Sequence, residues 1–199
     1  MVDLREYSFV RRRYVAQAMN TNNQKQSSHE TALASGYTIR DLASTDYPSV
    51  LALNSAFERF LSPMDETRLV QLHQRASYAR VALHHSSAVA FLLAFRERAI
   101  YDSPNYVWFD QRYPSFLYID RIVVSADHQG KRLGRALYTD LFRFATEARI
   151  PRVTCEFDIE PPNEASRRFH AEFGFREVGT QRVAYGRKQV SLQEASLSQ

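Results

Sequence analysis

The alternation of apolar and polar residues predicts several strands along the chain. In the stretch Arg152 to Ile159 every second residue is apolar, which is typical of a strand whose two faces meet different surroundings. The stretch Phe116 to Val124 is the strongest strand signal, because it is rich in β-branched and aromatic residues. Tyr78 to His84 and Ala88 to Phe95 are joined by a short polar turn and indicate a hairpin.

A second pattern, of apolar residues three or four positions apart, predicts helices. After the strand that ends at Val124, one apolar stripe runs until Pro151 ends the helix; it is formed by Leu133, Leu137, Leu141, Phe144 and Ala148. With weaker signals included, strands are expected at 37–40, 78–84, 88–95, 116–124, 152–159, 176–183 and 188–193, and further helices at 46–60, 63–76 and 163–173. This order predicts a single α/β (α+β) domain built on one mixed sheet.

The chain divides into three parts by composition. Residues 1–36 contain Arg11-Arg12-Arg13 and a polar run without periodicity, so we expect a disordered or poorly structured N-terminal extension. An extension without function is favoured over a functional basic arm. Residues 37–193 hold the predicted domain, and residues 194–199 form a C-terminal tail.

Composition and charge narrow the function classes. The 199 residues are 44% hydrophobic and 24% charged, as in ordinary globular proteins. The longest apolar run, Ala88 to Phe95, is far shorter than the roughly 20 residues of a membrane helix, so no membrane partner is expected. A net charge of +4 is weak evidence for nucleic acid and fits a single anion-binding patch equally well.

The cysteine and histidine residues indicate whether the chain could bind a metal. The single cysteine, Cys155, excludes an intramolecular disulfide and argues against a thiolate metal site, and no histidines converge on acidic residues. Cys155 lies on the apolar side of its strand and is interpreted as a core residue. We therefore predict no metal. Without a secretory signal pattern, a cytoplasmic location is expected.

The segment Ile122 to Arg135 predicts an anion site. A buried strand runs into a loop with Gly130 and then into a helix that opens near Leu133. Such a junction directs unpaired backbone N–H groups and the positive helix end to one point. Lys131, Arg132 and Arg135 add charge in the same turn, and neither of the familiar ATP or dinucleotide glycine patterns is present.

Two motifs identify a family resemblance. Gln129-Gly130-Lys131-Arg132-Leu133-Gly134 matches [QR]-x-x-G-x-[GA], except that Arg132 replaces the middle glycine. The pattern N-x-x-[AS]-x-x-[FL]-[YH]-x-x-x-G-F is matched further along by Asn163, Ser166, Phe169, His170, Gly174 and Phe175. Between about Tyr37 and Gln193 the chain thus resembles the GNAT superfamily, the acyl-CoA-dependent N-acyltransferases.

The resemblance implies a fold and a cofactor site. It implies a mixed, mostly antiparallel twisted sheet with helices on both faces, and acetyl-CoA as co-substrate. The backbone of Ile122, Val123 and Val124 would pair with the pantetheine arm, and Asn163 would meet the pantetheine or the acyl region. The pyrophosphate would be held by Gln129, Gly130, Lys131, Arg132, Leu133, Gly134 and Arg135.

The expected chemistry needs a base, because an amine with a pKa of about 10.4 is almost wholly protonated at pH 7. Three acidic residues are candidates: Asp120, Glu156 and Asp158. Asp120 lies at the position where some polyamine-acetylating relatives place a base, and Asp120 and Glu156 are the two expected to be catalytic. Thr154, Glu156 and Asp158 share the polar face of one strand, which favours a water-filled cleft over a solvent-exposed edge.

Each candidate also has a structural interpretation. Asp120 could pair with Arg121. His170, at the position of a tyrosine that protonates the thiolate in relatives, could be an ordinary helix residue. Asn163 is expected to cap its helix as well as to bind ligand.

We expect an N-acetyltransferase that moves an acetyl group to a primary amine by direct transfer in a ternary complex. Seven aromatic residues between Tyr101 and Tyr118 could enclose a small-molecule acceptor, or could form a satellite hydrophobic cluster. Alternatives are a protein or peptide N-acetyltransferase and a non-catalytic acyl-CoA-sensing or nucleic-acid-binding module. The oligomeric state, a homodimer included, stays open.

Overall fold

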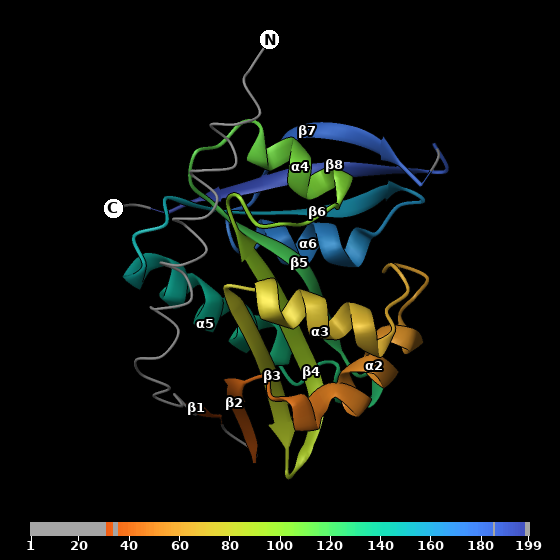
Figure 1. Cartoon of the computed structure of the whole chain (residues 1–199), viewed down its shortest axis with the longest axis vertical. Coiled ribbons are helices and arrows are strands. Elements are labelled where there is room, and N and C mark those ends of the chain that lie inside the picture. The colour runs from red at the N-terminus through yellow and green to blue at the C-terminus, as the bar shows by residue number, and fades with distance from the viewer. Residues whose placement is uncertain (1–30, 34–35, 185, 198–199) are drawn as a thin grey trace, which may run out of the picture.

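The protein forms one sheet with helices on both faces, as seen in a computed structural model that describes residues 31–33, 36–184 and 186–197 (Figure 1). The strand order is β1-β2-β3-β4-β5-β6-β8-β7, and neighbouring strands are antiparallel except for the parallel pair β5 and β6. The strands are β1 Thr31–Leu33, β2 Tyr37–Asp41, β3 Tyr78–His84, β4 Ser87–Arg96, β5 Leu117–Val124, β6 Arg152–Glu160, β7 Arg176–Val183 and β8 Lys188–Ser196.

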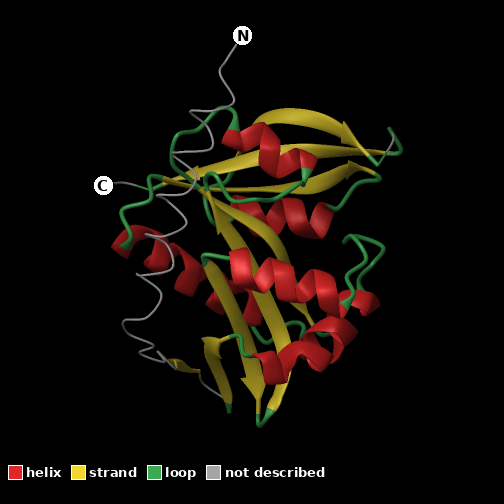
Figure 2. Ribbon diagram, in the orientation of Figure 1, coloured by secondary structure: helices red, strands yellow, loops and turns green. Residues whose placement is uncertain are grey.

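The helices divide between the two faces of the sheet (Figure 2). They are α2 Tyr47–Ala56, α3 Glu66–Arg75, α4 Pro104–Asp110, α5 Leu133–Glu147 and α6 Glu164–Ala171, with short 3-10 turns at Ser44–Asp46 and Ala126–His128. α2 and α3 cover one face of β2–β5, and α5 covers the other (Figure 1). Among the described residues no helix is long and apolar enough to span a bilayer.

Two hydrophobic clusters hold these layers together. Leu137 and Leu141 of α5 pack in one cluster with sheet residues such as Leu92 and Val153. Leu69 of α3 and Phe109 of α4 pack in the other cluster on the opposite face. Because both faces of the central strands are covered, their sequences are almost continuously apolar, as in β4.

The sheet divides between β5 and β6. These strands pair at Leu117↔Val153 and Tyr118↔Thr154 only, and no other described strand pairs with that edge of β5 beyond Tyr118. In Figure 1, β6, β8 and β7 cross the upper part of the molecule at a steep angle to β3–β5. The edge of β5 from Ile119 to Val124 therefore keeps backbone groups available on this side.

A β-bulge lies on the other side of β5. Arg121 is opposite Leu93 of β4 but Ile119 is opposite Ala94, so Asp120 is the extra residue. A bulge interrupts the alternation of side chains. As a result Asp120 and Arg121, adjacent in sequence, bind one another by an ion pair of 2.5 Å.

The predicted fold class is confirmed, with three local differences. Residues 31–33, assigned to the extension by composition, form β1 against β2, whereas residues 1–30 of that extension lie outside the described part. α4 was not predicted, because a seven-residue helix is too short to show periodicity. β8 continues to Ser196, so residues 194–196 of the predicted C-terminal tail belong to the sheet instead.

Candidate active site

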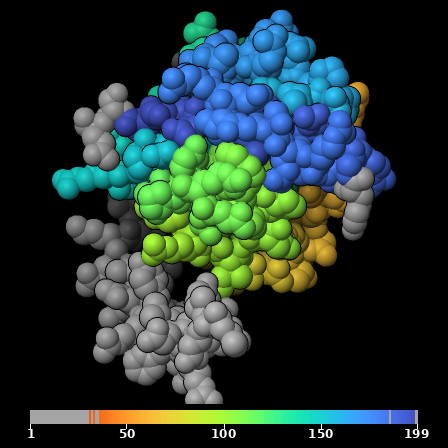
Figure 3. All heavy atoms as spheres, turned by 90° about the horizontal axis from the view of Figure 1, so that it is seen from above, coloured from red at the N-terminus to blue at the C-terminus, as the bar shows by residue number. Residues whose placement is uncertain are grey.

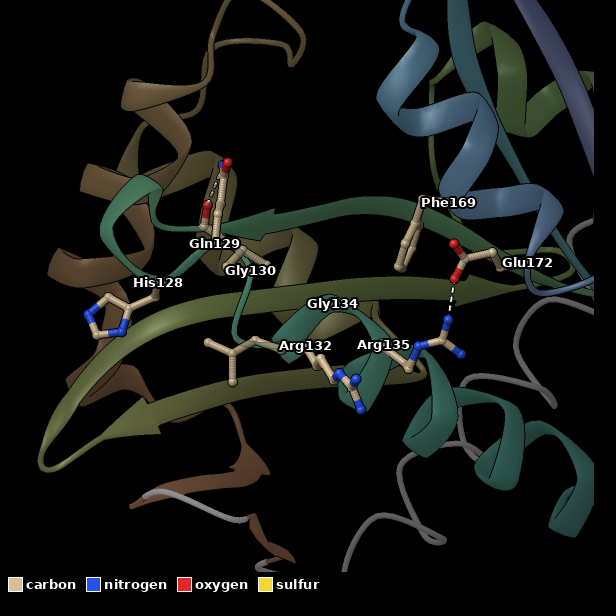
Figure 4. Close-up of a pocket in the computed structure, with 10 residues that line it drawn as sticks. His128, Gln129, Gly130, Arg132, Gly134, Arg135, Phe169 and Glu172 are labelled. Carbon is tan, nitrogen blue, oxygen red and sulfur yellow. Dashed lines mark hydrogen bonds and ion pairs between the residues drawn. The ribbon is translucent and has the colours of Figure 1, made fainter.

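A pocket of about 310 Å³ lies where the loop after β5 meets the beginning of α5 (Figure 4). It is lined by Val124, His128, Gln129, Gly130, Arg132, Leu133, Gly134, Arg135, Phe169 and Glu172. The residue before α5, Arg132, gives no side-chain cap to the helix. The first N–H groups of the helix and two arginines therefore favour an anion in this pocket.

The loop reaches this geometry through two left-handed residues. Gly130 has φ 74°, which is readily adopted without a Cβ atom. Arg132 has φ 62°, at the position of the middle glycine of the first motif. The arginine thus adopts a backbone conformation that glycine would provide without strain, and it places a cation at the pocket.

α6 closes the far side of the pocket. Phe169 packs against Gly134, where an added Cβ would lie 3.5 Å from the Phe169 ring. Arg135 forms an ion pair with Glu172, just beyond the end of α6 (Figure 4). Phe169 belongs to the second motif, but no sequence signal pointed to Glu172, which occupies an unspecified position of that motif.

Most of the residues expected to bind a pyrophosphate do line this pocket, but Lys131 does not. Ile122, Val123 and Val124 pair with β4 on one side of β5, and no strand of the described residues pairs with them on the other side. Val124 also lines the pocket. The Gln129 side chain donates to the Val124 carbonyl at 3.4 Å. The pocket and the unpaired edge are therefore continuous.

Glu156 of β6 lies just beyond the last β5–β6 pair. Its Oε1 accepts hydrogen bonds from Asn105 Nδ2 at 2.8 Å and from the hydroxyl of Tyr118 on β5 at 3.0 Å. Its Oε2 is inaccessible and has no partner among the described residues, although the residue as a whole is partly exposed. Burial raises the pKa of Glu156 to about 8, and the two hydrogen bonds oppose this rise.

Asp120 has both carboxylate oxygens occupied. Oδ2 accepts from Arg121 Nε at 2.5 Å, and Oδ1 accepts from the Tyr101 hydroxyl. Arg121 is buried and also donates to Asn54 Oδ1 at 2.8 Å. The contacts thus favour the structural pairing of Asp120 with Arg121 over a free carboxylate.

The polar face of β6 is covered and is not a solvent-exposed edge. β6 lies between β5 and β8, and Thr154 is fully buried with its hydroxyl unpartnered among the described residues. Asp158 forms an ion pair with Lys188 of β8 at 2.9 Å. On the opposite face, Cys155 is buried in the core, as predicted.

His170 is separated from these carboxylates by its packing on the other face of β6. Its Nε2 lies 2.9 Å from the Tyr138 hydroxyl, and its Nδ1 lies 2.7 Å from the Ser166 carbonyl. The ring stacks on Phe157, and burial lowers the pKa of His170. With both nitrogens engaged, the arrangement favours a structural role.

Asn163 is the N-cap of α6, since its Oδ1 accepts from the Ser166 N–H at 3.1 Å. This confirms the predicted cap. Asn163 does not line the pocket described above. No group of three or more His, Cys, Asp or Glu side chains in the described ranges is arranged to hold a metal ion.

The aromatic segment before β5 is largely a packed cluster. Tyr106, Phe109, Phe116 and Tyr118 are each at most 1% exposed and contact one another. Tyr101 is the member that contacts Asp120. The structure therefore supports the hydrophobic-cluster interpretation for most of these rings.

This geometry defines an α/β protein with a divided sheet and an anion pocket at a helix N-terminus. Comparison with known proteins identifies its family. The acetyltransferase (GNAT) family matches residues 37–175. The chain belongs to this family. The family and the enzyme class predicted from the two motifs are thereby confirmed.

Individual relatives are similar over different lengths. A phosphinothricin N-acetyltransferase of Streptomyces coelicolor is 42% identical over 67 residues, which are 34% of this chain and 37% of that protein. The ribosomal-protein-S18-alanine N-acetyltransferase of Escherichia coli has a TM-score of 0.61 at 19% identity, over 82% of this chain and 95% of that chain. YncA, described as a putative acetyltransferase of Salmonella typhimurium with its cofactor acetyl-CoA, has a TM-score of 0.64 at 19% identity, over 83% and 96%. The two structures support the fold.

Proposed function

We propose that this chain transfers the acetyl group of acetyl-CoA to a primary amine, directly, in a complex that holds both substrates. The observation that carries the proposal is the division of the sheet. It leaves an unpaired β5 edge that is continuous with the anion pocket at one end and is adjacent to Glu156 at the other.

The residues fit the parts of acetyl-CoA. The α5 N-terminus, Arg132 and Arg135 suit a pyrophosphate, since they combine backbone N–H donors with positive charge. The extended backbone of Ile122 to Val124 suits an amide-containing arm, which can pair with it as an added strand would. The cofactor site proposed here comprises the pocket lining together with this edge.

Glu156 is the proposed base. A carboxyl with a pKa near 8 is matched to proton transfer at neutral to mildly alkaline pH, and the Glu156 residue is partly exposed. The amine nitrogen attacks the thioester carbonyl carbon, its proton passes to Glu156, and the carbon–sulfur bond breaks. The departing thiolate needs no dedicated acid, because a thiol pKa of about 8.5 makes it a stable leaving group.

A small-molecule amine is the acceptor class we favour. The matching segment of the phosphinothricin N-acetyltransferase supports this choice, because that relative's name specifies a small molecule. The two structural neighbours support only the fold at their identities. Experiments therefore have to distinguish a small-molecule acceptor from a protein acceptor and from binding of acyl-CoA without turnover.

The cofactor site can be tested by titrating acetyl-CoA into the protein and measuring the midpoint of thermal unfolding. Free CoA and ATP serve as comparisons. A ligand at 100 times its dissociation constant adds about 2.7 kcal/mol to the free energy of unfolding. We expect stabilisation by acetyl-CoA and CoA. No stabilisation at millimolar acetyl-CoA would contradict the proposed site.

Thiol release with a panel of small amines and short peptides then tests turnover and acceptor class. The isosteric change Glu156→Gln should lower kcat by roughly 10²- to 10⁴-fold while leaving acetyl-CoA binding intact. Turnover with peptides alone would overturn the small-molecule acceptor. Binding without turnover of any amine would favour the sensing module.

A further inference from the structure

Glu156 is held asymmetrically, by two donors on one oxygen. Asn105 and Tyr118 both donate to Oε1, whereas Oε2 has no partner among the described residues. The two bonds therefore fix the orientation of the Glu156 carboxylate through one oxygen.

The orientation of the Asn105 amide is set by a third side chain. Gln181 of β7 donates from Nε2 to Asn105 Oδ1 at 3.1 Å. Because an amide has its donor and its acceptor on opposite arms, this bond turns Nδ2 of Asn105 towards Glu156. Asn105 is 8% exposed, so water competes little for either contact.

α4 is docked on β7 by a second contact that keeps Asn105 in place. The Trp108 ring packs on Gly179, where an added Cβ would lie 2.9 Å from Cζ2. In the space-filling view from above, the green atoms of the region around α4 lie against the blue atoms of the C-terminal region (Figure 3). Asn105 and Trp108 therefore tie one helix to β7 at two points.

We propose that Asn105, oriented by Gln181, is a positioning residue that fixes Oε1 of Glu156 and thereby orients the carboxylate that takes the substrate proton. The inference rests on the proposed role of Glu156 as base. The charged groups around Glu156 are Asp120, paired with Arg121, and Asp158, paired with Lys188. Both carboxylates disfavour ionisation of Glu156, whereas the donated hydrogen bonds favour it.

Variants that remove one donor test the inference. Asn105→Leu keeps the side-chain volume, and Tyr118→Phe removes only a hydroxyl; each should shift the pKa of Glu156 upward by about one unit or more. Gln181→Leu should shift it in the same direction but less, because Asn105 can still donate. Gln193→Leu is the matched control, since Gln193 is a buried amide on β8 that bonds Ser191 and not Glu156.

Two measurements separate the effect of Asn105 on the pKa of Glu156 from the role of Glu156 as a base in the reaction. Carboxyl carbon NMR of glutamate-labelled protein, assigned with Glu156→Gln, measures the pKa of Glu156 without turnover. The pH profile of kcat/KM measures the base in action. We expect both to move together, with about a tenfold loss of kcat/KM at pH 7 for Asn105→Leu and recovery at alkaline pH.

Each other outcome is informative. An unchanged pKa in Asn105→Leu would overturn the positioning role of Asn105. A shifted pKa with an unshifted rate profile would overturn Glu156 as the base, and the inference with it. An equal shift in Gln193→Leu would show a general effect of the fold, and would also overturn the inference. Thermal midpoints identify any variant that fails to fold. If Asn105→Leu does not fold, Gln181→Leu carries the test, and an unchanged pKa of Glu156 in that variant would overturn the inference.

Discussion

Arg135 in the first turn of α5 forms an ion pair with Glu172 beyond α6, and both side chains line the anion pocket (Figure 4). The two side chains are 52% and 54% exposed, so their contact is in reach of solvent. An acidic side chain is unexpected in a pocket formed by a helix N-terminus and arginines. A bound anion must compete with Glu172 for the Arg135 guanidinium.

This competition predicts that Glu172→Gln binds acetyl-CoA more tightly. An exposed ion pair contributes about 0.2–1 kcal/mol, so its loss should lower the dissociation constant by up to roughly fivefold. Arg135→Gln should raise it. Calorimetric titrations at low and high salt provide the measurement, and the difference should shrink at high salt as charges are screened.

Glu164→Gln is the matched control, because Glu164 pairs with Arg167 on the same α6 but does not line the pocket. Its affinity for acetyl-CoA should equal that of the unaltered protein. Weaker binding by Glu172→Gln would contradict the competition, and would show that Glu172 supports the ligand site.

The sequence predicted the parts of the site that depend on local patterns. The loop from Gln129 to Arg135 was found because glycine and helix-start signals lie within a few residues of one another. The bulge at Asp120 was not, since it depends on the register of β5 against β4. The contact of Asn105 with Glu156, and that of Gln181 with Asn105, also escaped prediction, because these residues are distant in sequence and α4 is too short to show periodicity.

We expect substitution of Arg132 to affect acetyl-CoA binding more than the stability of the fold. Its φ of 62° is strained for a residue with a Cβ, at a cost of about 1 kcal/mol or more. Arg132→Gly relieves that strain but adds chain entropy to the unfolded state, so the free energy of unfolding should stay within about 1 kcal/mol. The affinity for acetyl-CoA should fall, because a cation of the pocket is lost.

Lys131→Ala separates local charge from net charge. It removes the same charge one residue earlier, from a side chain that is exposed and does not line the pocket. Urea unfolding and acetyl-CoA titration of both variants provide the comparison. An equal loss of affinity in both variants would attribute the effect to net charge.

We expect substitution of His170 to lower the free energy of unfolding without lowering kcat. His170→Phe removes the hydrogen bonds to Tyr138 and Ser166 and leaves the buried Tyr138 hydroxyl unsatisfied, at a cost of about 1–3 kcal/mol. The kcat of the folded variant should stay close to that of the unaltered protein. A large fall in kcat with a changed alkaline limb of the pH profile would instead identify His170 as an acid, and Tyr138→Phe isolates the structural contact.

Glu156 predicts a pH-dependent stability difference that needs no substrate. Its pKa rises from 4.5 to about 8 on folding, because burial disfavours the charged form. The unfolded chain therefore releases this proton at lower pH than the folded protein, and the contribution of Glu156 to stability is lost as pH rises towards 8. Glu156→Gln cannot ionise, so its free energy of unfolding relative to the unaltered protein should increase by about 1 kcal/mol per pH unit between pH 5.5 and 7.5. Urea unfolding of both proteins across this range measures the difference.

Glu164→Gln is the control. Its difference in free energy of unfolding from the unaltered protein should not change with pH, because the bond to Arg167 lowers the pKa of Glu164 and this group titrates below the range. A flat difference for Glu156→Gln as well would mean that Glu156 is ionised throughout, and its pKa would then not suit the proposed proton transfer.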